Sequence, residues 1–405
     1  MPAVSFGGLL VVALVAVGAP LLVGLVPWIR VPAVVLEIVA GIVLGPSGLG
    51  WVKVDLPIQI LAVIGLAFLL FLAGLEIDVA GLRGAVLRQA GLGFGLTLVL
   101  GVAVGLGFHA LGDVKSPLLL AVALSATSLG LVVPVLKDAG QVERPLGQLT
   151  IAGASVADFG AIVLLSLLFS EMAASIGSTL TLLGLFAGLV AAVGLAFARL
   201  NRSVRLDAVL VRLQDTTAEI RVRLAIVLLI GFVALAEDLG LETILGAFLA
   251  GAILNLVDKD SMSHPNFRLK LEAIGYGFVV PVFFIASGLR FDLNALVESP
   301  SAFLKVPLFL LALVLVRGVP ALLYAPDVGR RAAMAAGLLQ ATSLPFLVTA
   351  TQIGVTLGEI RGDTAAALVS AGLLSVVIFP LAALSLLGRP GPAAPGALAP
   401  AGVRP

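Results

Sequence analysis

Long apolar stretches alternate with short polar segments along almost the whole chain. Thirteen stretches are apolar over about 18 residues or more, the length that a helix needs to cross a bilayer. They are centred near residues 17, 40, 66, 98, 125, 159, 187, 230, 248, 280, 312, 343 and 374. A large soluble protein with buried helices is disfavoured because the stretches repeat over the full length. The pattern therefore predicts an all-α polytopic membrane protein with about 13 transmembrane helices.

Three short matches between the two halves of the chain indicate an internal duplication. The matched segments pair AGIVL from Ala40 with AGAIL from Ala250, GLEID from Gly74 with GLRFD from Gly288, and ATSL from Ala126 with ATSL from Ala341. Matches this short also arise by chance in apolar sequence. Each pair is nevertheless seven predicted helices apart, and because seven is odd, the two copies have opposite orientations across the membrane. Such inverted-topology repeats are typical of secondary transporters.

Both ATSL copies place small and hydroxyl residues inside helices that are otherwise apolar. A proline follows each copy, and because proline has no N–H, Pro134 and Pro345 free the carbonyls of Gly130 and Ala341. We therefore expect two unwound helices that cross near the membrane midplane and present half-helix ends to an ion. The residues of this predicted crossing are Ala126, Thr127, Gly130, Ala341, Thr342, Ser343 and Pro345. Two merely kinked helices are the alternative.

Composition supports the membrane assignment and removes several classes of site. The 405 residues are 60% hydrophobic and only 12% charged, against about 25% charged in soluble domains. The chain has no cysteine, which excludes disulfides and thiolate metal sites. Its 24 basic and 23 acidic residues give no indication of nucleic-acid binding. No phosphate-binding loop, dinucleotide fingerprint or hydrolytic triad is found, so we expect neither an enzyme nor a cofactor.

The distribution of basic residues predicts the orientation in the membrane. Eighteen of the 24 lie on one side of the predicted topology, five lie on the other, and Arg317 lies inside a helix. The positive-inside rule then places the N-terminus outside and the C-terminus in the cytoplasm. Residues 1–387 are predicted to form the transmembrane domain, with the first helix retained. Residues 388–405 are rich in Pro, Gly and Ala and are predicted to be a disordered cytoplasmic tail.

Three charged residues inside apolar stretches are candidates for function, because such a charge costs about 2.5–3.5 kcal/mol on insertion scales. Asp158 has no compensating charge nearby in sequence, and Ser155 precedes it by one helical turn. A purely structural Asp158 is the alternative. Arg317 is predicted to neutralise a carboxylate or to donate to the carbonyls of the broken helices, unless it reaches an interface. An interfacial and a functional role are equally compatible with the position of Glu37.

A carboxylate inside the membrane is suited to exchange chemistry. It can bind either a proton or a dehydrated monovalent cation, and the two compete for one charge. Oxygen ligands from carboxylate, hydroxyl and carbonyl groups suit Na+ or K+ better than a soft metal. The residues therefore predict a monovalent cation at Asp158, in competition with H+.

Five segments resemble a known family. These segments are EIVAGIVLGPSGLG, FLLFLAGLEID, ALSATSLGLVVPVLKD, LGAFLAGAIL and VVPVFFIASGLRFDL. In this order they are similar to the sodium/proton exchanger-like domain of the bacterial monovalent cation:proton antiporters, in the second cation:proton antiporter family. The resemblance covers roughly residues 8–387. It implies a core ion-transport bundle with two crossed unwound helices, a dimerisation bundle that forms a homodimer, an elevator-like motion and a bacterial inner-membrane location.

The resemblance also implies roles for individual residues. Asp158 matches the essential ion-binding aspartate of the family, and Arg317 matches a basic position in the helix before the second unwound one. The polar neighbours of the ion match Thr127, Ser128 and Ser155. Ala157 is a departure, because electrogenic members carry a second aspartate there. With one carboxylate we expect electroneutral exchange of one cation for one proton.

Two other functions remain as alternatives. A sodium-coupled symporter of an organic anion would need further polar residues at the crossing, and only Gln340 fits. A channel or a sensor would need charged rings or a filter-like repeat, which the sequence lacks.

Overall fold

The computed structural model describes residues 6–25, 32–76, 84–169, 216–239, 241–257, 266–297 and 300–387, with a few single residues between 177 and 192. Within these ranges every regular element is a helix, apart from one isolated bridge between Val114 and Ile360. The apolar stretch predicted near residue 187 and the predicted tail at 388–405 lie outside the described residues.

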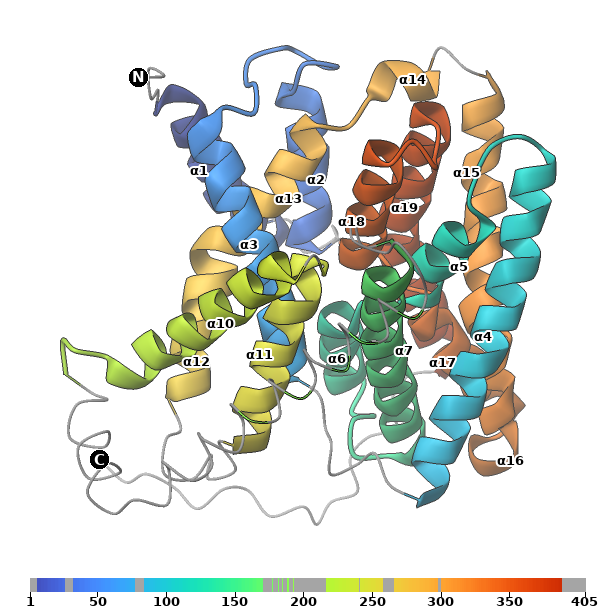
Figure 1. The fold of residues 1–405 in the computed structure, drawn as a ribbon. Helices are drawn as coiled ribbons and strands as arrows, with labels where there is room; N and C mark the ends of the chain where they lie inside the picture. Colours follow the sequence, from blue (N-terminus) through green and yellow to red (C-terminus); the bar gives the residue numbers. More distant parts are fainter. Residues whose placement is uncertain are drawn as a thin grey trace.

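One group of helices, which we call the α3 bundle, occupies one half of the molecule (Figure 1). Its members pack on one another around α3 and α13. They are α1 (Gly7–Leu25), α2 (Ala33–Leu44), α3 (Leu56–Leu75), α10 (Ile220–Asp238), α11 (Thr243–Val257), α12 (Phe267–Ile274), the π-helix η1 (Gly275–Val279) and α13 (Val280–Leu289).

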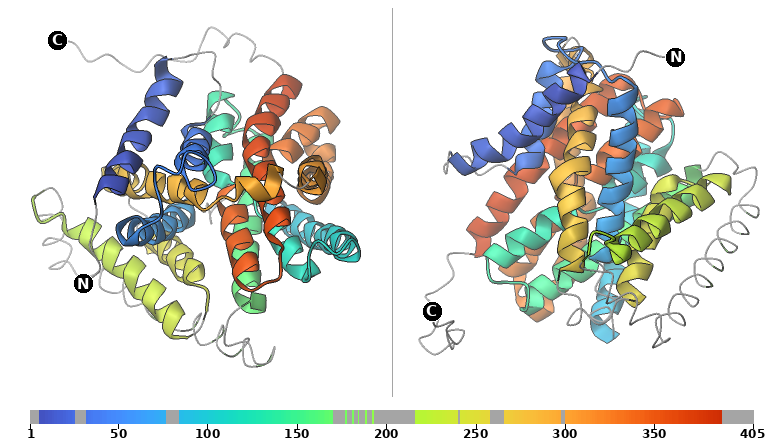
Figure 2. Two further views of the ribbon diagram at one scale, coloured as in Figure 1. Left: turned by 90° about the horizontal axis from the view of Figure 1, so that it is seen from above. Right: turned by 90° about the vertical axis from the view of Figure 1, so that its left-hand side faces the viewer.

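The other half is the α7 bundle, and the two bundles lie side by side when the molecule is seen from above (Figure 2). Its first members are α4 (Gly84–Ala110), α5 (Pro117–Ser125), α6 (Leu129–Asp138) and α7 (Pro145–Phe169). Later segments of the chain add α14 (Leu293–Val297), α15 (Pro300–Leu313), the π-helix η2 (Val314–Gly318), the 3-10 helix η3 (Pro320–Tyr324), α16 (Ala325–Val328), α17 (Arg330–Gln340), α18 (Pro345–Thr356) and α19 (Gly362–Leu387). Helices α7 and α11 meet where the bundles adjoin.

Seven of the described helical segments are long and apolar enough to cross a membrane, and an eighth is formed if α17 and α18 count as one span bent by 46°. This finding agrees with the predicted all-α polytopic membrane protein. The total of about 13 transmembrane helices stays a prediction.

Glycines allow the helices of the α3 bundle to pack backbone against backbone. A side chain at Gly251 of α11 would meet the carbonyl oxygen of Phe71 in α3, and one at Gly41 of α2 would meet that of Ile285 in α13. Small residues at such crossings let helices approach closely within a lipid environment. Gly251 and Gly41 occupy matching positions of the AGAIL and AGIVL segments. The two crossings therefore use the same positions of the two sequence copies.

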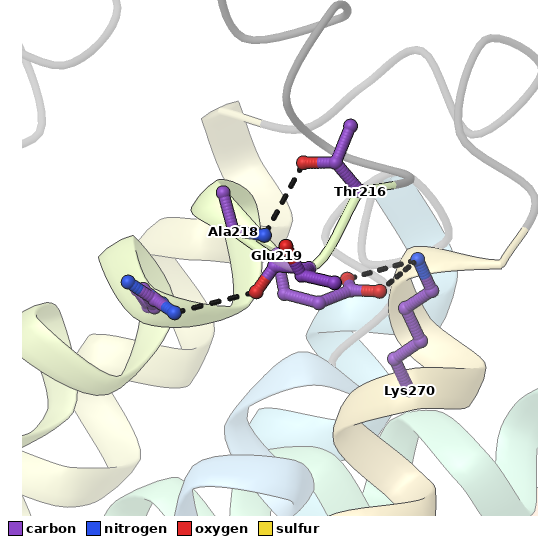
Figure 3. Close-up of polar contacts among 6 residues, drawn as sticks. Thr216, Ala218, Glu219 and Lys270 are labelled. Atoms are coloured by element: carbon purple, nitrogen blue, oxygen red, sulfur yellow. Dashed lines mark hydrogen bonds and ion pairs between the residues drawn. The ribbon is translucent and has the colours of Figure 1, made fainter.

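An ion pair fixes the start of α10 to α12 (Figure 3). Glu219 precedes α10 with a left-handed backbone, at a φ of 42°, a conformation that is uncommon for residues other than glycine. The ammonium of Lys270 donates to both of its carboxylate oxygens, at 2.9 and 3.0 Å. Just before it, the N–H of Ala218 donates to the hydroxyl of Thr216. This junction holds α12 beside α10 at one end of the α3 bundle.

Candidate functional site

Asp158 of α7 lies against the break between α5 and α6. Helix α5 ends at Ser125, α6 begins at Leu129, and the backbone of Ala126 between them is extended. The N–H of Thr127 donates to the Oδ1 atom of Asp158 at 2.8 Å. Because this break ends at the N-terminus of α6, the positive end of that helix lies on the same side as the carboxylate. In a regular helix the N–H of Thr127 would bond to a carbonyl of its own helix. At the break it is available to the carboxylate of Asp158.

The second break, between α17 and α18, is bonded directly to the first. The N–H of Ser128 donates to the carbonyl of Thr342 at 2.8 Å, and the N–H of Leu344 donates to the hydroxyl of Ser128 at 2.9 Å. The hydroxyl of Thr127 donates to the carbonyl of Gln340 at 2.7 Å. The two ATSL segments, 215 residues apart in sequence, therefore satisfy one another's free backbone groups.

The backbone around the second break is held by a hydroxyl and not by an acid. The N–H of Ser343 donates to the Oγ atom of Ser375 in α19, and that hydroxyl lies 3.2 Å from the carbonyl of Ser343. Asp158 follows the first ATSL and Ser375 the second at similar distances along the chain. Ser375 was not among the residues predicted from the sequence. Serine is common enough in membrane helices that its presence alone gave no signal.

Arg317, which lies in η2, is buried and bonded to hydroxyls. Its Nη2 and Nε atoms donate to the hydroxyl of Thr127 at 2.7 and 3.0 Å, and Nη1 donates to the hydroxyl of Thr97 in α4 at 3.2 Å. A longer bond reaches the carbonyl of Gly153 at 3.4 Å. Arg317 therefore bonds to two hydroxyls and to a carbonyl of α7, and not to the carbonyls of the broken helices as predicted. Thr97 was missed because a threonine in an apolar stretch carries no signal until its neighbour is known.

The predicted cause of the first break also needs correction. Gly130 and Pro134 both lie inside α6, which begins at Leu129. The interruption at residues 126–128 therefore precedes both of them. The interruption occurs instead where the N–H of Thr127 finds a carboxylate and that of Ser128 finds a carbonyl. Pro345 is the first residue of α18, where its missing N–H needs no partner.

A cavity opens beside Asp158 at the junction of the two bundles. Its polar lining includes Glu76 at the end of α3, Tyr276 of η1, and Thr127 and Ser128 of the first break, and most of the remaining lining is apolar. Its volume of about 90 Å³ exceeds the roughly 10–15 Å³ that one water centre needs. A small ion with some of its water can therefore be accommodated next to the carboxylate.

Two other predicted residues, Ser155 and Glu37, are both absent from the lining of the Asp158 cavity. Ser155 lies one turn before Asp158 on α7, is buried, and its hydroxyl has no hydrogen-bond partner among the described residues. Such an oxygen is free to bind a ligand. Glu37 is buried on α2 in the α3 bundle, and it does not line the Asp158 cavity.

The donor set favours a monovalent cation. Within the described ranges no group of three or more His, Cys, Asp or Glu side chains is placed to hold a metal ion. Asp158 with nearby hydroxyl and carbonyl oxygens offers hard ligands, and Glu76 adds a second carboxylate to the cavity lining.

Comparisons with known proteins identify the family to which the chain is similar. The family profile described as "Sodium/hydrogen exchanger, transmembrane" matches residues 12–385. The putative Na(+)/H(+) antiporter YjbQ of Bacillus subtilis is 31% identical over 402 residues, covering 95% of this chain and 64% of that protein. The Na(+)/H(+) antiporter of Enterococcus hirae is 29% identical over 365 residues, covering 87% of this chain and 90% of that protein. The chain thus spans less than two thirds of the Bacillus protein.

The fold also matches a solved structure. The sodium proton antiporter MjNhaP1 from Methanocaldococcus jannaschii superimposes with a TM-score of 0.64 over 94% of this chain and 99% of that one. At 18% sequence identity, this likeness concerns the fold alone.

Proposed function

Because this chain belongs to the family of transmembrane sodium/hydrogen exchangers, we propose that it is a secondary active antiporter that exchanges Na+ or K+ for H+ across the membrane. The observation that carries the proposal is the bond from the N–H of Thr127 to Asp158 beside a cavity. It leaves one carboxylate in a helix break where a cation and a proton compete. On this proposal the protein is a transporter and not an enzyme, and it needs no cofactor.

The contacts of the polar neighbours suggest separate roles for them. The hydroxyl of Thr127 already serves Arg317 and Gln340, and that of Ser128 serves Leu344. We therefore assign these two side chains to holding the breaks together. The unpartnered hydroxyl of Ser155 is the better candidate for a direct ligand of the ion. Arg317 acts by fixing the first break, and Glu37 compensates charge or stabilises the core.

Alternating access in this proposal comes from an elevator-like movement of the α7 bundle against the α3 bundle. The two ATSL breaks belong to inverted repeats and cross near the midplane, as in other transporters with interrupted helices. Ala157 leaves Asp158 as the one carboxylate at this position of α7, so one cation exchanges for one proton without net charge movement. A membrane-potential-dependent transport rate in proteoliposomes would contradict this stoichiometry.

The remaining features follow from the orientation and the resemblance. We propose a bacterial inner-membrane protein whose N-terminus is outside and C-terminus cytoplasmic, with the transmembrane domain at residues 1–387 and the tail at 388–405. The α3 bundle is the dimerisation half of a homodimer. An organic-anion symporter is disfavoured, since most of the lining of the Asp158 cavity is apolar.

Reconstitution into proteoliposomes tests the function. A pH gradient is imposed, Na+, K+ or Li+ is added in turn, and dissipation of the gradient is followed with a pH-sensitive dye. We expect Asp158→Asn to abolish cation-dependent dissipation, whereas Glu237→Gln, at an exposed acid at the end of α10, leaves it unchanged. The proposal fails if no cation dissipates the gradient or if the Asp158→Asn protein is as active as the original.

A further inference from the structure

A second cavity lies between the same two bundles, at the other end of α3. The Asp158 cavity is lined by the last turns of α3, including Ala73 and Glu76, whereas the second cavity is lined by its first turns, including Gln59 and Val63. The second cavity also takes residues from α13, α18 and α19. Along α3, the two cavities therefore open toward opposite sides of the membrane.

Only a thin layer of protein separates these cavities. In α18, Phe346 lines the Asp158 cavity and Val348 lines the second one. In α13, Phe284 lines the first and Ser287 the second. One helical turn rises about 5.4 Å, so along the axis of each helix the residues that line the two cavities lie within about one turn of each other. The second cavity is thus placed as the other access route to the same ion site.

Matching positions of the two sequence copies line these cavities with opposite charges. Glu76 is the third residue of GLEID and lines the Asp158 cavity. Arg290 is the third residue of GLRFD and lines the second cavity. The charged residues that line the first cavity are the acids Glu76 and Asp158, whereas those of the second are Arg290 and Asp292. The lining of one access route carries acids alone, with the guanidinium of Arg268 4.0 Å from the carboxylate of Glu76, and the lining of the other is balanced in charge.

We propose that Arg290 makes the exchanger asymmetric, by weakening capture of the cation from the side of the second cavity. The proposal rests on the proposed cation:proton exchange. A cleft lined by charges of one sign raises the local concentration of counter-ions, and a charge of the other sign removes that gain. Asp292 partly offsets Arg290, so the route is not closed to cations. In the proposed orientation the second cavity faces outward, and the cation is captured more readily from the cytoplasm.

The test measures KM for the cation separately from the two sides of oriented proteoliposomes. Because the chain has no cysteine, a Lys115→Cys variant labelled with a membrane-impermeant maleimide reports the orientation. Lys115 is exposed, and its N–H bonds to Glu359 in the α18–α19 loop, close to the second cavity. Arg290→Gln, Arg290→Lys and Asp292→Asn are compared with Lys115→Gln, which changes a basic residue outside the cavity.

We expect Arg290→Gln to lower KM on the Arg290 side by about two- to fivefold at low ionic strength, and less at high salt because the field is screened. Asp292→Asn raises KM on that side. Arg290→Lys and Lys115→Gln leave KM on the Arg290 side unchanged. KM on the Asp158-cavity side stays constant in all four variants, which also shows that they fold correctly.

Unchanged KM values in Arg290→Gln, or equal shifts on both sides, would overturn the inference while leaving the antiporter function intact. If the unmodified protein shows no exchange, the proposed function itself fails, and the inference fails with it. Should Arg290→Gln not fold, the opposite shift expected for Asp292→Asn still decides the question.

Discussion

The guanidinium of Arg317 is bonded to the hydroxyl of Thr127 through two of its nitrogens, at 2.7 and 3.0 Å. The same threonine donates its N–H to Asp158. Arg317 therefore bonds to the break and not to the carboxylate, so in the proposed function the oxygens of Asp158 are left for an ion. In the proposed function, this relationship separates the residues that hold the site in place from the residues that bind the ion.

Replacing Arg317 with methionine should destabilise the protein more than it changes ion affinity. The variant loses the bonds to Thr127, Thr97 and Gly153, and a hydrogen bond to a charged group contributes about 1.5–3 kcal/mol. Arg317→Lys should recover part of the loss, since an ammonium lacks the planar fork that reaches two hydroxyls. Thermal unfolding in detergent measures the effect, with exposed Arg331→Met as the control. An unchanged melting temperature for Arg317→Met would contradict this assignment.

Ser155→Ala should weaken cation binding without lowering stability. No hydrogen bond to the Ser155 hydroxyl is lost among the described residues, whereas a direct ligand contributes on the order of 1 kcal/mol, or about a fivefold rise in KM. Ser166 is a matched control, because it is also buried on α7 with an unpartnered hydroxyl. Equal KM values for Ser155→Ala and Ser166→Ala would exclude Ser155 as a ligand.

Protons and cations should compete for Asp158. If one carboxylate binds both, KM for the cation rises as the pH falls, by up to about tenfold per pH unit, and the maximal rate falls at high pH, where the proton needed to complete the cycle is scarce. At high pH, where the carboxylate carries no proton, KM reaches a constant minimum. Initial rates at several pH values, with equal pH on both sides, measure this dependence. A KM that does not change with pH would indicate a separate proton site.

Gly251→Ala should separate α3 from α11 and destabilise the α3 bundle. The added methyl group meets the carbonyl oxygen of Phe71, which is backbone and cannot rotate away, and such overpacking costs about 1–3 kcal/mol. Gly95→Ala in α4 is the matched control, because nothing lies within 4 Å of its added carbon. Thermal unfolding of the two variants compares them directly. Equal stability would show that the helices part freely at this crossing.

The sequence was sufficient to predict the class of protein and the charged core of the site. Asp158 and Arg317 are visible because a charge stands out in an apolar stretch. Thr97 and Ser375 could not be predicted in the same way, because a hydroxyl can bond within its own helix or to another helix, and only the packing decides. Ala126 and Thr127 lie in the first break as predicted, but Gly130 lies inside α6, and the break was wrongly attributed to Pro134. The N–H groups of the break are satisfied by Asp158 and Thr342, which are distant in sequence.

The direct backbone contacts at Gly251 and Gly41 have a mechanical consequence. Helices usually slide past one another by changing the rotamers of the side chains between them. At these two crossings no such layer exists, so α3 with α11, and α2 with α13, are expected to move as coupled pairs. In the proposed elevator-like movement, these pairs would travel as units, and displacement would fall at the boundary where α7 meets α11.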